Sequence, residues 1–262
     1  MDQPRYSYPP LGLLALAAAV LFGGRRSFRR DGLACVGRLE PPLRVLGEEN
    51  VPRSGPALIT FNHYARPGFH AWWMALALAA VVPAEMHFVM TGELTFPGKR
   101  YAPLGQAGSR WLLKRLAKVY DFTIMPPMPP RPRDVTGRAH SVRAVLSHLK
   151  RNPQAVLGLA PEGGDMPGGR LCMPPPGAGR FMVLLTGAGL PVVPAAFYEE
   201  AGTACLRFGP EYWLPVPAGA LPQERDRTTA RFVMERIAQL LPVSLRGEFT
   251  NGENRGRTAT SG

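Results

Sequence analysis

Cysteine is scarce in this chain, with three in 262 residues. Cys35, Cys172 and Cys205 lie far apart, and none belongs to a C-x-x-C pair. This spacing argues against a disulfide framework and against a cysteine-based zinc site. Reduced thiols are typical of proteins that face the cytoplasm, so we expect free cysteines in such an environment.

Acidic residues are also few, 19 against 31 Lys and Arg, so the formal net charge is +12. This charge favours anionic partners: nucleic acid, an anionic membrane leaflet, or substrates that carry phosphate or CoA. The sequence contains no recognisable nucleic-acid-binding motif, so net charge is the only support for such a partner. We therefore expect a membrane surface with anionic lipids, and no nucleic acid.

The N-terminal region lacks an apolar run of the roughly 20 residues that a membrane-spanning helix needs. A shorter run of apolar residues and glycine covers residues 11–24, and Arg25, Arg26, Arg29 and Arg30 follow it. We interpret the run as an interfacial or re-entrant anchor, with a full span and a buried core helix as alternatives. If the run spans a bilayer, the arginines place the remaining chain on the cytoplasmic side.

Short apolar segments alternate with helical patterns along the rest of the chain. The sequence predicts strands over 57–61, 86–90, 120–125, 155–160, 192–197 and 204–208, and helices over 69–82, 106–119, 142–149, 178–188 and 229–241. Such alternation favours a single α/β domain whose mostly parallel mixed sheet is covered by helices. We assign residues 1–44 to a membrane-associated segment with an apolar anchoring helix, 45–249 to this domain, and the polar residues 250–262 to a disordered tail.

The predicted strand at 57–61 ends in Asn62 and His63, directly before an apolar helix. A strand-to-helix junction is a frequent place for a catalytic imidazole, and the helix N-terminus there offers backbone N–H groups to an anion. A lone histidine is more often structural, so the neighbouring motifs decide its meaning. His70 lies seven residues further on. It has no third metal ligand nearby in sequence, which leaves a displaced base as the alternative to His63.

Two later segments complete a recognisable series. The first is Pro-Glu-Gly-Gly-Asp at residues 161–165, and the second is Pro-Val-Val-Pro at residues 191–194. In this order and at this spacing, these segments and Asn62-His63 resemble the glycerolipid acyltransferase family, of the 1-acylglycerol-3-phosphate O-acyltransferase type. The resemblance runs from about Val45 to Phe249.

The resemblance implies a membrane-associated enzyme of phospholipid or glycolipid biosynthesis. Such an enzyme moves a fatty acyl chain from acyl-CoA or acyl carrier protein to a hydroxyl of a lysophospholipid or related lipid acceptor. The resemblance also implies direct attack of that hydroxyl on the thioester, with no metal and no cofactor, at the cytoplasmic face of the inner or plasma membrane. The sequence has no G-x-S-x-G elbow, consistent with the absence of an acyl-enzyme intermediate.

Carried over to this sequence, the family motifs make His63 the general base and match Glu162 in the family's F-P-E-G-T-R-S block. We take His63 and Glu162 as the catalytic candidates. The candidates for substrate binding are Asn62, Gly163, Gly164, Arg170, Arg131 and Pro194, with Arg133 as the alternative to Arg131.

Two positions depart from the family pattern. The family has an orienting aspartate where this chain has Gly68, and a phosphate-binding arginine where it has Asp165. In hydrolase triads, loss of the orienting carboxylate lowers kcat about 10⁴-fold. Tyr64, Glu162 and Asp165 are the candidates to replace that carboxylate. The departures also leave open a second interpretation, a relative that binds lipid or acyl-CoA but is catalytically impaired.

Overall fold

A seven-stranded sheet runs through the computed structural model, which describes residues 3–94, 98, 100–127, 131–164, 167–215 and 221–254. The strands are β1 (Arg44–Leu46), β2 (Ala57–Phe61), β3 (Met86–Thr91), β4 (Thr123–Met125), β5 (Val156–Leu159), β6 (Val192–Glu200) and β7 (Thr203–Phe208). Their order is β1-β7-β6-β2-β5-β3-β4, and among these neighbours only β6 and β7 pair antiparallel. The predicted mostly parallel mixed sheet is therefore confirmed.

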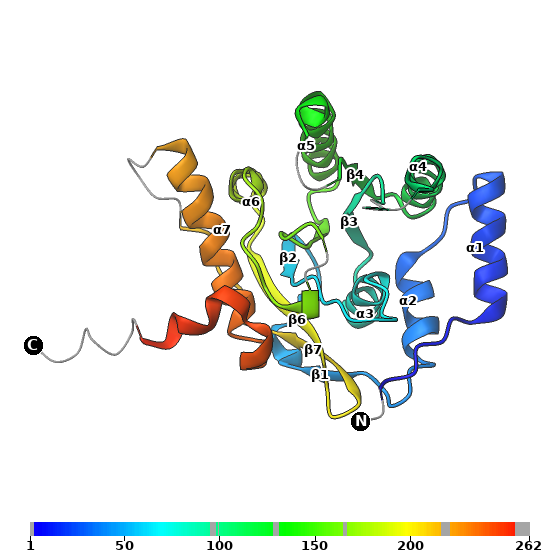
Figure 1. Cartoon of the computed structure of the whole chain (residues 1–262), viewed down its shortest axis with the longest axis horizontal. Helices are drawn as coiled ribbons and strands as arrows, with labels where there is room; N and C mark the ends of the chain where they lie inside the picture. Colours follow the sequence, from blue (N-terminus) through cyan, green and yellow to red (C-terminus); the bar gives the residue numbers. More distant parts are fainter. Residues whose placement is uncertain are drawn as a thin grey trace, which may run out of the picture.

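The helices of the described residues pack around this sheet (Figure 1). They are α1 (Pro10–Phe22), α2 (Phe28–Val36), α3 (Trp72–Val81), α4 (Ala102–Tyr120), α5 (Val135–Arg151), α6 (Ala178–Gly187) and α7 (Pro222–Ala238). One face of the sheet shares a hydrophobic core with α2, α3 and the end of α4. The other face packs against α5, α6 and α7, which completes a three-layer α/β/α arrangement.

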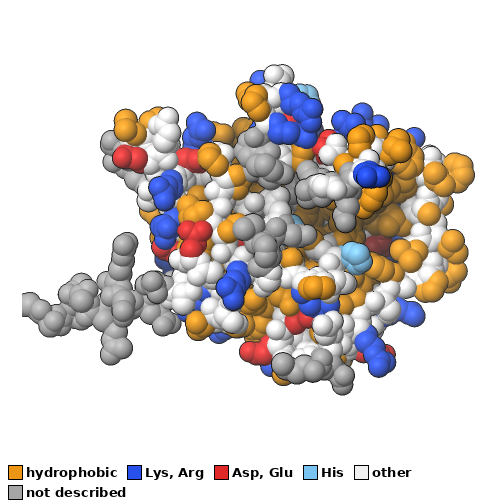
Figure 2. Space-filling view, in the orientation of Figure 1, with side chains coloured by type: hydrophobic (Ala, Val, Ile, Leu, Met, Phe, Trp, Pro, Cys, Tyr) orange, Lys and Arg blue, Asp and Glu red, His pale blue; other side chains and the backbone are white. Residues whose placement is uncertain are grey.

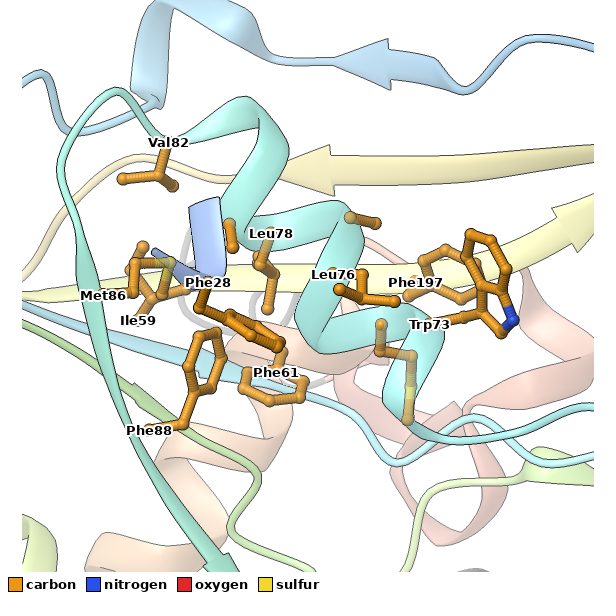
Figure 3. Packing of buried hydrophobic residues seen from close by; sticks show 14 of the residues in the cluster. Phe28, Ile59, Phe61, Trp73, Leu76, Leu78, Val82, Met86, Phe88 and Phe197 are labelled. Carbon is orange, nitrogen blue, oxygen red and sulfur yellow. The ribbon is translucent and has the colours of Figure 1, made fainter. Parts of the chain in front are cut away.

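The helix α2 was not predicted from the sequence, yet it supplies a central core residue. Phe28 is almost fully buried, and its ring lies 5.4 Å from the Phe88 ring and 4.9 Å from the Tyr120 ring, both edge-on. Figure 3 shows the Phe28 ring beside Phe61 and Phe88 under α3. Gly32 allows α2 to approach α3, because a Cβ at this position would lie 2.7 Å from the Leu76 carbonyl oxygen.

The ends of the chain differ in part from expectation. The N-terminal apolar run forms α1, which has 13 residues. Among the described residues, no helix is both long enough and apolar enough to cross a bilayer. Near the other end, Gly247–Asn254 forms a 3₁₀ helix, which includes the first five residues of the predicted tail, 250–254. The rest of that predicted tail, 255–262, lies outside the described residues.

Candidate active site

His63 lies at the carboxyl edge of the sheet, in the turn that follows β2. The strands β5 and β6 flank β2 in parallel register, so the chain leaving β5 at Pro161 emerges beside this turn. The His63 side chain is half-buried. The first two predicted motifs therefore meet at one edge of the sheet although about a hundred residues separate them.

Asn62 fixes the start of the turn. Its side chain is fully buried, its Nδ2 donates to the Phe197 carbonyl at 2.9 Å, and its Oδ1 accepts from the Phe197 N–H at 2.8 Å. The amide thus imitates one more residue of β2 pairing with β6. Because both of its polar side-chain atoms pair with β6, Asn62 holds the start of the turn in place.

Glu162 joins the two motifs directly. Its Oε2 accepts a hydrogen bond from the His63 backbone N–H at 2.7 Å, and its Oε1 accepts one from the Cys172 backbone N–H at 2.9 Å. The carboxylate is only 6% exposed, and this burial raises the pKa of Glu162, while the two N–H donors act in the opposite direction. Glu162 therefore supports the His63 backbone, which makes it a positioning residue.

Glycine permits the close approach of the loop that follows Glu162. Gly169 has a φ of 64°, and a Cβ there would lie 2.9 Å from the Ala65 carbonyl oxygen and 3.1 Å from its nitrogen. The loop therefore packs its backbone against the residues just beyond His63. Arg170 follows this contact and is exposed, with no ion pair to any residue that the structure describes.

An ion pair holds the chain just beyond His63, near the position of the missing family aspartate in the sequence. Arg66 donates two hydrogen bonds to Glu199, at 2.7 and 2.9 Å, and Tyr6 donates to the same carboxylate at 2.7 Å. Gly68 has a φ of 77°, and the nearest atom to a Cβ built there is Arg66 Nη1, at 3.9 Å. The turn is thus fixed from Glu199 on β6, and residue 68 adopts a backbone conformation that favours glycine.

A cavity of about 310 Å³ opens at the same edge, between α5 and α6. Gly163, the neighbour of Glu162, lines it together with apolar residues and prolines from β3, β4 and β5. Two arginines, Arg138 and Arg180, also line it. Burial lowers the pKa of Arg138, whose Nη2 donates to the Pro127 carbonyl at 2.6 Å.

The remaining candidates differ in their surroundings. Arg131 forms ion pairs with Glu93 at 3.1 Å and with Asp134 at 2.5 Å, so its guanidinium already has anionic partners. Pro194 is buried inside β6, opposite Thr60 of β2, where it packs against the position of Gly209. Gly164 is half-buried and has open space around its Cβ position. Asp165 lies outside the described residues.

Sequence reasoning did not find Arg66, Glu199, Arg138 or Arg180. The pair Arg66 and Glu199 is separated by 133 residues, so no local pattern connects the two side chains. The arginines of the cavity come from two different helices. The helical pattern of α5 gave partial information about one of them. Arg138 lies four residues before the apolar Val142, so both residues face one cavity.

Comparison with known proteins adds two findings. A family model described as Acyltransferase matches residues 42–198, a range that contains both His63 and Glu162. The crystal structure of the 1-acyl-sn-glycerophosphate (LPA) acyltransferase, PlsC, from Thermotoga maritima has a similar fold, with a TM-score of 0.50 and 14% sequence identity. The similarity covers 88% of this chain and 94% of that chain. A search of curated proteins gave no match.

Proposed function

Because the chain belongs to the acyltransferase family, we propose that it transfers a fatty acyl chain from a thioester to a hydroxyl of a lysophospholipid or related lipid acceptor. The motif resemblance that the sequence suggested is confirmed at the level of the family. The observation that best supports the proposed chemistry is the Glu162 carboxylate, which holds the His63 backbone at the carboxyl edge of the sheet, while the next residue, Gly163, lines the cavity there.

In the proposed reaction, the His63 imidazole removes the proton of the acceptor hydroxyl as its oxygen attacks the thioester carbonyl. The carbon–sulfur bond then breaks, and the thiolate of CoA or acyl carrier protein takes the proton from the imidazolium. An ester and a free thiol result, so atoms and charge balance without a metal or a cofactor. The half-buried position of His63 suits this role. The ring must be accessible to the substrates and yet partly shielded from water.

We also propose which groups contact the substrates. The apolar lining of the cavity suits an acyl chain, and Gly163 brings that lining to the residue next to Glu162. Arg170 and Arg180 are exposed at this edge, so they are the arginines we propose for a phosphate or another anionic group of the acceptor or donor. Arg131 is the weaker candidate because its guanidinium already forms ion pairs with Glu93 and Asp134.

We propose that the protein associates with a membrane through a surface formed by α1 and α4. Hydrophobic side chains gather over both helices at the right of Figure 2. The large exposed ones are Leu11, Leu13, Leu14, Leu21, Phe22, Leu104, Trp111 and Leu112. Exposed basic residues of α4, Arg110, Lys114 and Lys118, lie on the same helix and suit anionic headgroups. We therefore propose that the protein lies on the cytoplasmic face of the inner or plasma membrane.

Vesicle sedimentation tests this surface. We expect the wild-type protein to sediment with vesicles that contain anionic phospholipid, and a Leu11→Ser, Leu14→Ser, Phe22→Ser variant to stay largely in the supernatant. Leu184→Ser on α6 is the matched control, since Leu184 is exposed but lies away from α1 and α4. Equal sedimentation of all three proteins contradicts the proposed docking surface.

A second candidate function, lipid or acyl-CoA binding without turnover, is favoured by Gly68. The deciding experiment incubates membranes containing wild type, His63→Ala or His70→Ala with labelled long-chain acyl-CoA and a panel of lysophospholipid and glycolipid acceptors. We expect product from wild type and from His70→Ala, and none from His63→Ala. Binding of acyl-CoA without product in every sample supports the non-catalytic relative, and loss of product only in His70→Ala moves the base to His70.

A further inference from the structure

Three side chains of metal-ligating type meet at the amino edge of the sheet, opposite the edge that holds His63. His87 lies near the start of β3, Asp121 follows α4, and His148 lies in the last turn of α5. One donor atom from each lies within 4.8 Å of the other two. Among the described residues this is the one such group, and the active-site turn contributes nothing to it.

His87 is oriented as a ligand would be. It is 7% exposed, and its Nε2 lies 2.9 Å from the Thr123 hydroxyl oxygen. Its Nδ1 is buried and has no hydrogen bond of good geometry, although the backbone of Asp121 lies close to the ring. When Nε2 carries the proton and donates to Thr123, the lone pair of Nδ1 is available. In metal-bound histidine, the ring nitrogen that does not bind the metal typically donates a hydrogen bond to a neighbouring group, as Nε2 would donate to Thr123 here.

His148 and Asp121 complete the group. The imidazole rings of His148 and His87 lie 3.7 Å apart, and His148 Nδ1 is 3.9 Å from the Asp121 carboxylate. Burial lowers the pKa of both histidines, that of His87 to about 4. The carboxylate of Asp121 is 62% exposed, and its contacts with Arg25 and with His148 are both long, at 3.9 Å, so it can move at little cost.

We propose that His87, His148 and Asp121 bind a divalent cation of the zinc class, with water in the fourth position. Two imidazoles and one carboxylate suit Zn²⁺, Co²⁺ or Ni²⁺ better than Mg²⁺ or Ca²⁺. Zinc lies about 2.1 Å from imidazole nitrogen, so tetrahedral ligand atoms are about 3.4 Å apart. Binding therefore contracts the group and reorients the stacked rings, a movement that the exposed Asp121 and the half-buried His148 can make.

The surroundings of the three ligands give an ion access to the site and influence its affinity. A cavity of about 670 Å³ is lined by all three side chains, which gives an ion a route and leaves room for water. Arg25 and Arg151 line the same cavity and oppose a cation. We therefore expect micromolar affinity and a structural role, in which the ion links β3, α4 and α5 away from the reacting edge.

Isothermal titration of ZnCl₂ into the full-length, chelator-treated protein tests the site. We expect one ion per chain. The variants are His148→Ala and Asp121→Asn, with the buried His87 left intact so that the core is preserved. His148→Ala should weaken binding at least about 100-fold, and Thr123→Val, which removes the supporting hydroxyl, about tenfold. The matched control is His140→Ala, an exposed histidine of the same helix, which should bind as wild type does.

Two further readouts separate this site from adventitious binding. Co²⁺ bound by nitrogen and oxygen ligands should give a visible absorption band in wild type and in His140→Ala, but not in His148→Ala. Zn²⁺ should raise the Tm of wild type and of His140→Ala, but not that of His148→Ala. The proposal is overturned if no saturable binding is found, or if His148→Ala and Asp121→Asn bind as tightly as wild type.

Discussion

The two edges of the sheet both bring a histidine and a carboxylate together, but burial is reversed between them. At the carboxyl edge the carboxylate of Glu162 is buried and the His63 ring is half-buried. At the amino edge the His87 ring is buried and the Asp121 carboxylate is exposed. A buried carboxylate held by two backbone N–H groups fixes the shape of a turn, whereas an exposed one remains available to a ligand.

The largest expected effect comes from removing the buried carboxylate. Glu162→Ala leaves the N–H groups of His63 and Cys172 without their acceptor, and each buried donor left unsatisfied costs about 1–3 kcal/mol. We expect the free energy of unfolding to fall by about 2–5 kcal/mol in chemical denaturation, with loss of acyl transfer.

Glu248→Ala is the control for this prediction. Glu248 also accepts from a backbone N–H, that of Met173 at 2.8 Å, but the contact is exposed. We expect a loss within about 1 kcal/mol, because water replaces the lost acceptor. Equal losses in the two variants would mean that burial of Glu162 does not distinguish the carboxyl edge.

The next effect concerns the ion pair on the other side of the His63 turn. The side chains of Arg66 and Glu199 are 15% and 9% exposed, so Arg66→Met should lower the free energy of unfolding by about 3 kcal/mol. The exposed pair of Arg44 and Glu200 is the comparison, and Arg44→Met should cost less than about 1 kcal/mol. A double variant, Arg66→Met with Glu199→Met, should lose less than the sum of its single variants. Additive losses refute a direct coupling across the turn.

A smaller effect is expected for the exposed arginine at the carboxyl edge. Arg170→Ala should raise KM for a phosphate-bearing acceptor about tenfold, equivalent to about 1.4 kcal/mol, and leave KM for an uncharged acceptor unchanged. Arg131→Ala should change neither KM, because Arg131 is already paired with Glu93 and Asp134. Steady-state kinetics with both acceptors checks this, and a reversed pattern would assign the anionic group to Arg131.

The smallest effect tests the position of the missing family aspartate. Gly68→Asp places a side chain at a positive φ, which should cost about 1 kcal/mol of unfolding free energy. Acyl transfer should not rise above wild type, because Arg66 and Glu199 already fix the turn. A clear gain in kcat would show instead that His63 is poorly oriented without a carboxylate at residue 68.

The strands and the meeting of two motifs were predictable because each rests on a local pattern. Apolar runs bounded by Gly and Pro mark β2, β5 and β6, and parallel pairing brings the segments that follow them to one edge. The strand β1 and the helix α2 were missed. Arg44–Leu46 has only three residues, and Phe28–Val36 carries charge in its first turn while burying few apolar side chains.

Side-chain roles were less predictable than side-chain positions. Glu162 matched a motif as a catalytic candidate, yet its carboxylate contacts backbone N–H groups. Asn62, a candidate for substrate binding, has a side chain that pairs with β6. The ligand group of His87, Asp121 and His148 has no local spacing at all, because three separate elements supply it.

The most direct test of this account compares the pH dependence of kcat/KM for wild type and Glu162→Gln, which keeps the size of the side chain. If His63 is the base and Glu162 only holds its backbone, the variant should be slower at every pH, with the acid limb of the profile unchanged in position. Disappearance or displacement of the acid limb in Glu162→Gln would contradict the account, because Glu162 itself would then be the group that titrates in the reaction.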